Sequence, residues 1–583
     1  CQYRGVGHPI ACAVTEALVD LAAQKIGMDP LRIRELNVIP DDAYPATGAS
    51  GIKLEVLSHE ASLKKLRELM NYDALRAEQA ALRQQGIYRG IGFATVIELT
   101  NPSAAFYGVG GARIASQDGA TARLDPEGDV TVLIGVGEQG QGTEGIYRQI
   151  AADAVGVDIQ KVKIVTGDTD TTPYGGGTWA SRGAGIGGEA VLLAGQALRE
   201  NIVKVAAVIL KREGSTLAVR RGRVVDAVTG EELLPLSELG RIAYFRSDTL
   251  PADFTPELMV TRHYAQRDYP FIFTNGVQAS YVEVDPDTGF VKLLKHWAVE
   301  DCGRVLNPML VDEQMRGAIV QGIGGALLEE CLYDEQGLMV NASMADYLVP
   351  MSSEMPDIEV AHVQTPTASS KLGAKGAGEA GTAGAPAAVM NAINDAMAPF
   401  DAHVFSQPIT PQKVLRALGK VRVHASRFKG APLPCDPDEI EVIPMDAPWP
   451  DVSLCIRVSD NGVGMAPPTL ARIFEPFFTT KPVGSGTGLG LAVVHGILRE
   501  HNAALRVKST LGQGTVFSVW LPAMDDSASS NAALQATQED VVPIKAKGAA
   551  ASRILYVDDD EAMAFLVQRF LDRNGYRVTT CFS

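Results

Sequence analysis

The sequence predicts α+β domains over residues 1–418, an α/β sandwich over residues 419–523, and the start of a further α/β unit over residues 553–583. Two observations lead to this prediction. Glycine-rich segments repeatedly precede stretches with helical apolar spacing, and strand-like stretches separate them. Near residue 418, a short helical run gives way to the strand-like segment KVRVHA. A chain of 583 residues is also too long for one hydrophobic core, so several domains are expected.

The composition is that of a globular protein, and it narrows the classes of partner. Hydrophobic residues make up 46% of the chain, charged residues make up 21%, and the formal net charge is -17. Because an acidic surface repels phosphate, nucleic acid is not an expected partner. No apolar run approaches the roughly 18 to 20 residues that cross a bilayer, so no membrane association is expected.

The seven cysteines are scattered and never spaced as C-x-x-C, which argues against a disulfide framework, an iron–sulfur site or a zinc site. A reducing cytoplasm is therefore the expected location. Cys302 and Cys331 are expected to be buried as small hydrophobic residues. Because the chain starts at Cys1 and ends at Ser583 inside a strand-like run, we expect a fragment of a longer protein.

The first elements alternate glycine-rich loops with helices. The segment RGVGHP precedes a predicted helix from Ile10 to Leu36, and strands are predicted over residues 88–135. A second glycine-rich turn, at residues 135–142, precedes a predicted helix over residues 145–155. Backbone N–H groups at such loops and at helix N-termini bind anions, because both present unpaired donors.

The same pattern continues to the end of the first part. The remaining predicted elements are a loop at residues 175–188 leading into a helix at residues 189–213, a hairpin at residues 279–299 with its turn at residues 285–289, a helix at residues 311–332, and the loop KLGAKGAGEAG before a helix at residues 385–397. The four glycine-rich loops could converge on one ligand.

The later part of the chain has a different pattern. Residues 420–523 alternate predicted strands and helices, including a strand from Leu454 to Val458. Residues 524–552 are rich in Ala, Ser, Asp and Gln without any period, which indicates a linker. Residues 553–583 have the pattern strand, helix, strand.

Particular polar residues accompany the glycine-rich loops of residues 1–418. They occur in the segments Tyr3-Arg4-Gly5-Val6-Gly7, Gly140-Gln141-Gly142, Thr178-Trp179-Ala180-Ser181-Arg182-Gly183, Asn307-Pro308 with Gln314, and Lys375-Gly376-Ala377-Gly378-Glu379. In this order they resemble the later part of the molybdenum-binding large subunit of the xanthine dehydrogenase/aldehyde oxidase family. The resemblance covers nearly all of residues 1–418, which would be an N-terminally truncated molybdopterin-binding domain.

The resemblance implies roles for individual residues. Glu379 is implied as the catalytic general base, since hydroxylation by water needs a group that takes up a proton. The residues implied to bind the cofactor are Arg4, Gly140, Gln141, Gly142, Ala180, Ser181, Gln314 and Gly378.

The resemblance also implies an activity and partners. The activity is the oxidation of an aldehyde or an aromatic N-heterocycle, with water as the source of oxygen. The cofactor would be molybdopterin with molybdenum, in the cytosine dinucleotide form. Electrons would pass to a 2Fe-2S small subunit and an FAD medium subunit. The family's earlier half, with an FGGKE-like loop and a further substrate-pocket arginine, has no counterpart here.

Taken one at a time, these residues have simpler interpretations. Gln141 and Gln314 would be exposed polar side chains, as Gln usually is. Glu379 would be a carboxylate stabilised by a helix N-terminus. Arg4 and Arg182 are equally compatible with surface roles. The shared order along the chain is what favours a cofactor site.

Three further segments resemble the ATPase domain of histidine kinases. They are Asp460-Asn461-Gly462-Val463-Gly464-Met465 after a strand, Phe474-Glu475-Pro476-Phe477-Phe478, and Gly486-Thr487-Gly488-Leu489-Gly490-Leu491. The glycine pattern continues through residues 512–515 into a final strand. The resemblance implies a GHKL-type ATPase fold over residues 419–523 and a site for ATP with magnesium. The ATP-binding residues would be Asp460, Gly462, Gly464, Gly486, Thr487, Gly488, Leu489 and Gly490.

The ATPase resemblance is incomplete at its start. The family holds magnesium with an asparagine on a first helix, and residues before 419 belong to the other resemblance instead. Asn391 and Asn394 are superficially similar to the asparagine of that helix, but their segment fits the first resemblance better. No histidine lies in a convincing phosphoacceptor helix, so autophosphorylation is not expected.

Residues Ile554 to Asp560 resemble the first strand of a response-regulator receiver. In that family an acidic pair, here Asp558 and Asp559, holds magnesium, as clustered carboxylates suit a hard cation. The phosphoaccepting aspartate would lie beyond Ser583, so this truncated receiver is not expected to be phosphorylated.

Three hypotheses follow for the whole chain: a molybdenum hydroxylase subunit, an ATP-binding signalling module, or a chimeric join in which neither activity is complete.

Overall fold

The computed structural model describes most of the chain. The described residues are 3–48, 51–105, 115–267, 271–334, 336–429, 439–443, 452–475, 478–480, 490–522, 553–557 and 577–581. The chain divides into two compact units, of which the first comprises Cys1–Ser426, Leu433–Met445 and Cys455–Trp520, and the second Arg427–Pro432, Asp446–Leu454 and Leu521–Ser583. None of the helices in the described ranges combines the length and the apolar character that a bilayer crossing requires.

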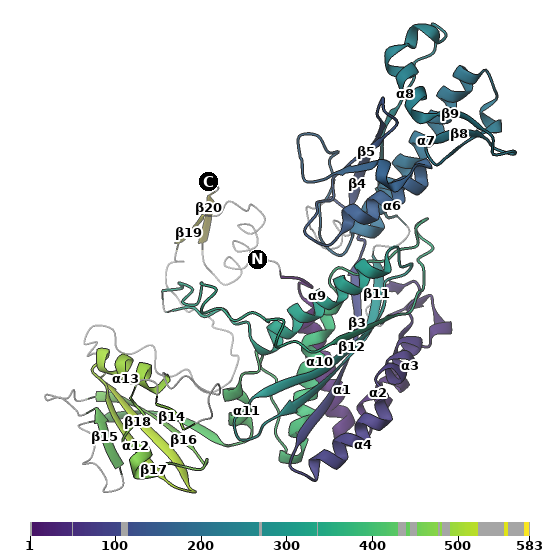
Figure 1. Ribbon diagram of the computed structural model, residues 1–583. Coiled ribbons are helices and arrows are strands. Elements are labelled where there is room, and N and C mark those ends of the chain that lie inside the picture. Colours follow the sequence, from purple (N-terminus) through teal and green to yellow (C-terminus); the bar gives the residue numbers. More distant parts are fainter. Residues whose placement is uncertain are drawn as a thin grey trace. The chain divides into compact units, whose positions relative to one another are not determined.

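A four-stranded sheet of order β13-β12-β11-β3 supports the candidate site (Figure 1). Strands β12 and β13 are parallel, and the other neighbours are antiparallel. The strands are β3 (Tyr88–Thr100), β11 (Ile272–Val284), β12 (Val291–Asp301) and β13 (Ile358–His362). The predicted hairpin at residues 279–299 is confirmed by β11 and β12, whose turn is closed by a 2.8 Å bond from the backbone N of Gly289 to the O of Asp285.

Helices cover both faces of this sheet. On one face, Ala94 and Val96 of β3 pack against α10 (Ala380–Met397), and the glycines at 90 and 92 leave room for the helix backbone. On the other face, residues 91 and 93 of β3 pack against the leucines of α3 (His59–Leu69). Alternate residues of β3 therefore point to opposite layers, as the pleat requires.

The remaining helices of this part are α1 (His8–Ile26), α2 (Pro30–Asn37), α4 (Tyr72–Arg83), α9 (Pro308–Leu327) and α11 (Pro411–Ala417). The prediction of one helix from Ile10 to Leu36 is wrong. Gly27 ends α1 in the left-handed conformation, and Asp29 caps a new helix by accepting hydrogen bonds from two backbone N–H groups. Helix α10 begins five residues before the predicted residue 385, so the glycine-rich loop is shorter than expected.

A second sheet, of order β10-β4-β5-β6, supports the middle glycine-rich loops. Its strands are β4 (Gln117–Leu124), β5 (Val130–Ile134), β6 (Val162–Val165) and β10 (Met259–Ala265). Helices α6 (Thr143–Val155) and α7 (Gly188–Leu210) pack against it in one apolar core. The helices predicted at residues 145–155 and 189–213 are confirmed.

Smaller elements complete the first part. They are the pair β1 (Ala46–Thr47) and β2 (Lys53–Leu54), the sheet of β7 (Leu217–Arg220), β8 (Arg223–Asp226) and β9 (Glu232–Pro235), and helix α8 (Leu236–Phe245).

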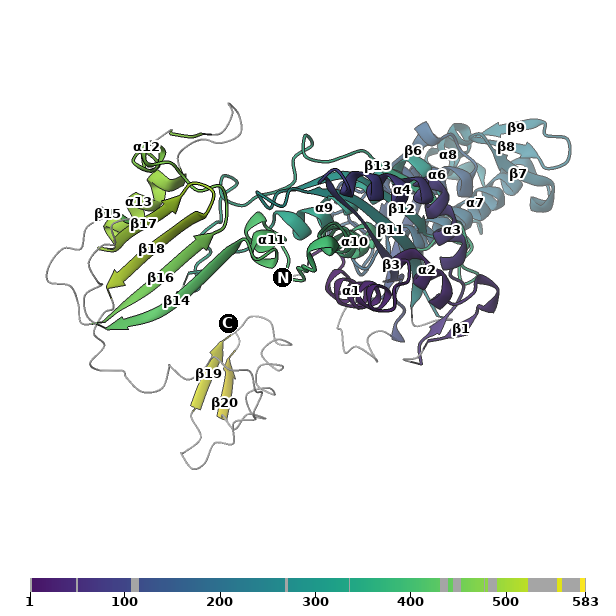
Figure 2. The ribbon, with the colours of Figure 1, turned by 90° about the horizontal axis from the view of Figure 1, so that it is seen from below.

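A five-stranded sheet of order β14-β16-β18-β17-β15 follows (Figure 2). Its elements are β14 (Val421–Lys429), β15 (Glu439–Ile443), β16 (Val452–Asp460), α12 (Pro467–Leu470), α13 (Gly490–Glu500), β17 (Ala504–Thr510) and β18 (Gly514–Pro522). The predicted alternation of strands and helices is confirmed for the described residues. The strand predicted from Leu454 to Val458 is longer at both ends.

Two short strands near the end of the chain, β19 (Arg553–Val557) and β20 (Arg577–Cys581), pair in parallel. They agree with the predicted first and last elements of residues 553–583. The predicted linker at residues 524–552 and the acidic pair Asp558 and Asp559 lie outside the described residues.

Candidate functional site

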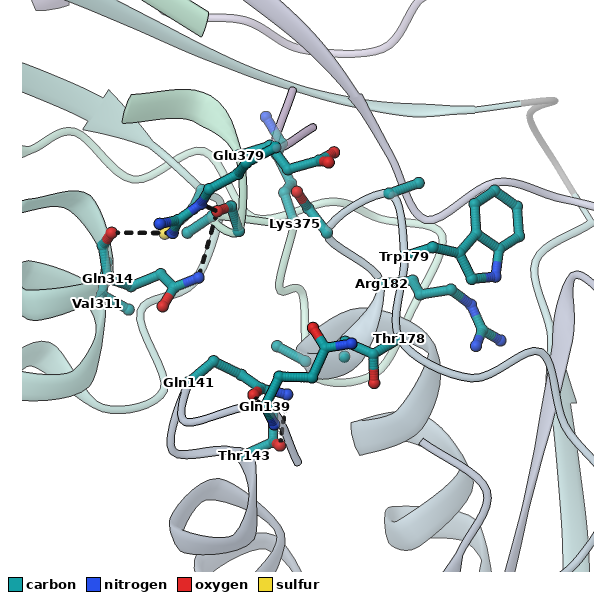
Figure 3. A pocket seen from close by; sticks show the side chains of 18 of the residues that line it. Gln139, Gln141, Thr143, Thr178, Trp179, Arg182, Val311, Gln314, Lys375 and Glu379 are labelled. Atoms are coloured by element: carbon teal, nitrogen blue, oxygen red, sulfur yellow. Dashed lines mark hydrogen bonds between the residues drawn. The ribbon is translucent and has the colours of Figure 1, made fainter. Parts of the chain in front are cut away.

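One cavity of about 1070 Å³ collects the glycine-rich loops of residues 1–418 (Figure 3). It is lined by Leu99 of β3 and by residues from five further segments, within residues 3–11, 139–146, 178–184, 302–317 and 374–379. Of the residues singled out from the sequence, it includes Arg4, Gly140, Gln141, Ala180, Ser181, Gln314, Gly378 and Glu379. Residues that are as much as 375 positions apart in the sequence therefore share one hollow.

Glu379 stands at the start of α10 and is held by the first loop. Its Oε1 accepts a 3.1 Å hydrogen bond from the backbone N–H of Gly5. The preceding carbonyl, of Gly378, accepts hydrogen bonds from Arg4 Nε at 2.6 Å and from Gln314 Nε2 at 3.2 Å. Figure 3 shows a hydrogen bond from Gln314 toward the loop that carries Glu379. Arg4 and Gln314 thus fix the loop that carries the carboxylate, and neither is a plain surface residue.

The turn of residues 180 and 181 packs directly against this loop. Ala180 and Ser181 have φ values of 46° and 51°, in the left-handed region that non-glycine residues seldom adopt. A Cβ on Gly376 would overlap the backbone O of Ser181, and one on Gly378 would lie 2.9 Å from Ser181 Oγ. Glycine at 376 is therefore required for the turn to reach the loop, and glycine at 378 leaves room for the Ser181 side chain.

The turn at residues 138–144 is organised by a carboxylate that the sequence analysis missed. Glu138 Oε1 accepts from the backbone N–H groups of Gly140 and Gly142, each at 3.0 Å, and Oε2 accepts from that of Glu144 at 3.0 Å. Burial raises the pKa of Glu138, but these bonds outweigh it, and the pKa lies below its ordinary value. An acidic residue just before a glycine turn and a helix start was the signal for it.

Two predictions for this turn need adjustment. The side chain of Gln141 turns back on its own segment, where Nε2 donates to Gly137 O and to Thr143 Oγ1, both at 3.1 Å. Gly142 does not line the cavity; it precedes α6 with a φ of 77°, against the side chain of Leu310. Gly142 is thus a backbone requirement of the helix start, and its predicted direct contact with a cofactor is not supported by its position.

Arg182 is buried, so the surface interpretation is wrong for it. Its Nη1 forms a 2.8 Å salt bridge with Asp118 Oδ2, and both side chains are 0% exposed. Its Nη2 donates to the backbone O of Gln117 at 2.8 Å. The guanidinium thus ties the 178–184 turn to β4.

Of the two cysteines expected to be buried, Cys302 is buried in the cavity wall, whereas Cys331 is exposed beyond the end of α9.

Glu300 is a fully buried acid on β12 that sequence analysis did not single out. Its Oε1 accepts a 2.7 Å hydrogen bond from Thr274 Oγ1, and Gly276, opposite it on β11, leaves space for the carboxyl group. Burial raises the pKa of Glu300 to about 8. At neutral pH the protonated form therefore predominates in the folded protein.

This gives a prediction for the pH dependence of stability. In the unfolded chain Glu300 loses its proton near its ordinary pKa of about 4.3, so between that pH and about 8 the folded state binds more protons. Stability should then fall as pH rises across this window. In urea unfolding at a series of pH values, Glu300→Gln should remove part of this fall, up to about 1.4 kcal/mol per pH unit. An identical pH slope in the variant would contradict the assignment.

The ATPase-like segment is only partly described. Asp460 ends β16, and its Oδ1 accepts from the backbone N–H groups of Gly462 at 2.8 Å and Thr515 at 3.2 Å. Gly464 adopts a φ of 61° beside the backbone of Thr510, and Gly490 begins α13. Gly486, Thr487, Gly488 and Leu489 lie outside the described residues.

Asn391 and Asn394 lie on α10 and serve the first part of the fold. Asn391 Nδ2 donates to the backbone O of Glu16 at 3.2 Å and of Phe93 at 3.1 Å. Asn394 forms two hydrogen bonds with the backbone of Val404. This confirms that the stretch fits the first resemblance better than that of a kinase helix.

Comparison with known families accounts for both parts of the chain. Residues 1–38 and 65–356 match models described as the molybdopterin cofactor-binding domain. Residues 411–525 match the histidine kinase-, DNA gyrase B- and HSP90-like ATPase. A receiver domain is not among these matches.

Curated relatives and solved structures match the first part. The nicotine 6-hydroxylase large subunit of Paenarthrobacter nicotinovorans is 36% identical over 415 residues, which are 71% of this chain and 50% of that protein. The carbon monoxide dehydrogenase large chain of Hydrogenophaga pseudoflava is 30% identical over 427 residues, covering 71% and 52%. Quinoline 2-oxidoreductase from Pseudomonas putida 86 has a TM-score of 0.66 at 36% identity, covering 72% and 53%.

The chain spans about half the length of the curated relatives it matches. The match to the molybdopterin cofactor-binding model over residues 65–356 extends across half of the chain. The relatives are molybdopterin oxidoreductases, and they include a xanthine dehydrogenase molybdenum-binding subunit of Escherichia coli. Residues 411–525 carry the match to the histidine kinase-like ATPase. The chain therefore belongs to the molybdopterin cofactor-binding family of xanthine dehydrogenase-type large subunits.

Proposed function

We propose that residues 1–418 form the cofactor-holding part of a molybdenum-dependent hydroxylase. The observation that carries the proposal is the gathering of Arg4, Gln141, Ser181, Gln314 and Glu379 around one cavity. The starts of α1, α6, α9 and α10 border this cavity, and glycines in the 376–378 loop allow close approach. Such an arrangement suits an anionic, pterin-sized ligand, because helix starts and bare backbone favour negative charge.

In this proposal each residue has a separate task. Arg4, Gly140, Gln141, Ala180, Ser181, Gln314 and Gly378 would contact a molybdopterin, in its cytosine dinucleotide form, that supplies two-electron oxidation of a substrate carbon with oxygen from water. Glu379 would take up the proton released in that reaction. The Gly5 N–H holds one of its oxygens, and this bond fixes the carboxylate orientation.

The proposed substrate is an aromatic N-heterocycle or an aldehyde. The relative and the solved structure with 36% identity are named for nicotine and quinoline, and this favours the heterocycle. Electrons would leave through a 2Fe-2S small subunit and an FAD medium subunit, since the relatives are subunits or chains of larger enzymes.

The metal content of the protein tests this proposal. The chain, produced together with an iron–sulfur and an FAD subunit in a host that makes the cofactor, should purify with bound molybdenum and pterin. Arg4→Met should lower the molybdenum content, because it removes the guanidinium that holds the Gly378 carbonyl. Arg246→Met, at an exposed ion pair with Asp248, is the matched control. A complex that contains the three subunits but no molybdenum would contradict the proposal.

We also propose that residues 419–523 bind ATP, a candidate function favoured by the geometry of Asp460. Its Oδ1 accepts hydrogen bonds from two backbone N–H groups, and these bonds fix the carboxylate orientation at the end of β16. Equilibrium dialysis of the full chain with ATP and magnesium should detect binding, and Asp460→Ala should weaken it. If the wild-type and variant chains bind ATP equally well, or if neither chain binds it, this site is contradicted.

A further inference from the structure

Glu98 is a fully buried carboxyl group beneath the loop of Glu379, and nothing above gives it a role. It lies near the end of β3, on the same strand face as Ala94 and Val96, which pack against α10. Its strand neighbour on β11 is Thr274, whose hydroxyl is directed to Glu300 and the backbone of Asp301. Within the described ranges, no Lys, Arg or His pairs with Glu98 as a salt bridge.

Among the described residues, the carboxyl group of Glu98 has one hydrogen-bond partner, which lies in the turn of residues 180 and 181. Ser181 Oγ donates a hydrogen bond to Glu98 Oε1, while Oε2 has no hydrogen-bond partner among the described residues. Ser181 is the residue that touches Gly376 and Gly378 and that adopts a left-handed backbone conformation. Such a conformation persists only where surrounding contacts hold it, and the bond to Glu98 is one such contact.

The surroundings of Glu98 disfavour a negative charge. Burial raises the pKa of Glu98 well above its ordinary value, and the nearby carboxyl group of Glu379 raises it further. The Ser181 hydroxyl and Arg4 act in the opposite direction but do not offset burial. An uncharged acid also lowers the cost of leaving Oε2 without a cation.

We propose that Glu98 is a positioning residue that holds the Ser181 turn against the Gly376–Glu379 loop. Its effect on the cofactor site rests on the function proposed above, whereas its effect on the turn does not. In this arrangement Glu98 adds no negative charge beside Glu379. The uncharged Glu98 orients the turn without repelling the base.

The test compares three replacements in the full chain with its partner subunits. The Gln side chain in Glu98→Gln is uncharged, and its amide oxygen can accept the hydrogen bond from Ser181. Molybdenum content should therefore stay close to that of the wild type. Glu98→Ala leaves the Ser181 hydroxyl unpaired, and Ser181→Ala removes the same bond from the other side. Both should lower molybdenum content by about 10- to 100-fold. Glu300→Gln, on the same sheet face without contact to Ser181, is the control and should have no such effect.

Two readouts do not depend on the cofactor. Glu300 also carries a proton at neutral pH, so both chains should show a protonated-carboxyl band in the infrared. The difference spectrum of the wild type minus Glu98→Gln should contain a further protonated-carboxyl band that shifts in D2O. The unfolding temperature should fall in Glu98→Ala and Ser181→Ala and should be restored in Glu98→Gln.

The outcomes separate this inference from the function on which it rests. If the wild-type complex holds no molybdenum, the hydroxylase proposal fails, and the infrared band and unfolding temperatures still decide the state and role of Glu98. If Glu98→Gln loses molybdenum or stability as Glu98→Ala does, a charged carboxylate is needed and the inference is wrong. If Ser181→Ala keeps the molybdenum content and the unfolding temperature of the wild type, the inference is also wrong, even if Glu98→Ala does not fold.

Discussion

Glu379→Gln is expected to lower kcat/KM for the substrate by a factor of about 100 to 10,000, which is the usual contribution of a general base. The amide keeps an oxygen that can accept the hydrogen bond from Gly5 N, so the loop should stay in place, but it cannot take up a proton. Steady-state kinetics should therefore show the loss in kcat, with molybdenum content equal to that of the wild type.

Two comparisons make this prediction specific to the base. Glu238→Gln, at an exposed ion pair with Arg241 outside the cavity lining, should leave the rate unchanged. If Glu379→Gln loses molybdenum instead of turnover, the carboxylate serves to hold the site together. A variant as fast as the wild type would remove Glu379 from the mechanism.

Asp118→Ala is expected to destabilise the chain by about 3 to 5 kcal/mol, which is the usual result of removing one partner of a buried ion pair. Both side chains of the Asp118–Arg182 pair are 0% exposed, so the replacement leaves an uncompensated guanidinium in the interior. The 178–184 turn depends on this guanidinium, and it should loosen as well. Urea unfolding followed by tryptophan fluorescence should detect the change, since Arg182 lies 5.9 Å from the ring centroid of Trp179.

The matched control removes both charges together. Asp118→Leu with Arg182→Met should cost less than Asp118→Ala alone, because no charge is left unpaired in the interior. Glu238→Ala, at the exposed pair with Arg241, should have little effect. A double replacement as destabilising as Asp118→Ala would mean that packing, not charge, explains the loss.

Most helix starts and strands could be predicted from the sequence, because they depend on local features. Glycine before a helix start and alternating apolar residues in β3 and β11 depend on a few neighbouring positions. The error at residues 10–36 has the same local origin. Continuous apolar spacing predicted one helix, but the combination of Gly27 and the Asp29-Pro30 cap ends one helix and begins another.

The sequence by itself determined the glycine-rich loops, their order and the carboxylate at residue 379, because each of these is written in a short segment. Tertiary structure alone decided which polar groups are buried and what they contact. Arg182 forms a hydrogen bond with Asp118, 64 positions earlier in the sequence, and Ser181 forms one with Glu98, 83 positions earlier. Whether a side chain is buried depends on neighbours brought together by folding, and neither its identity nor its local spacing contains that information.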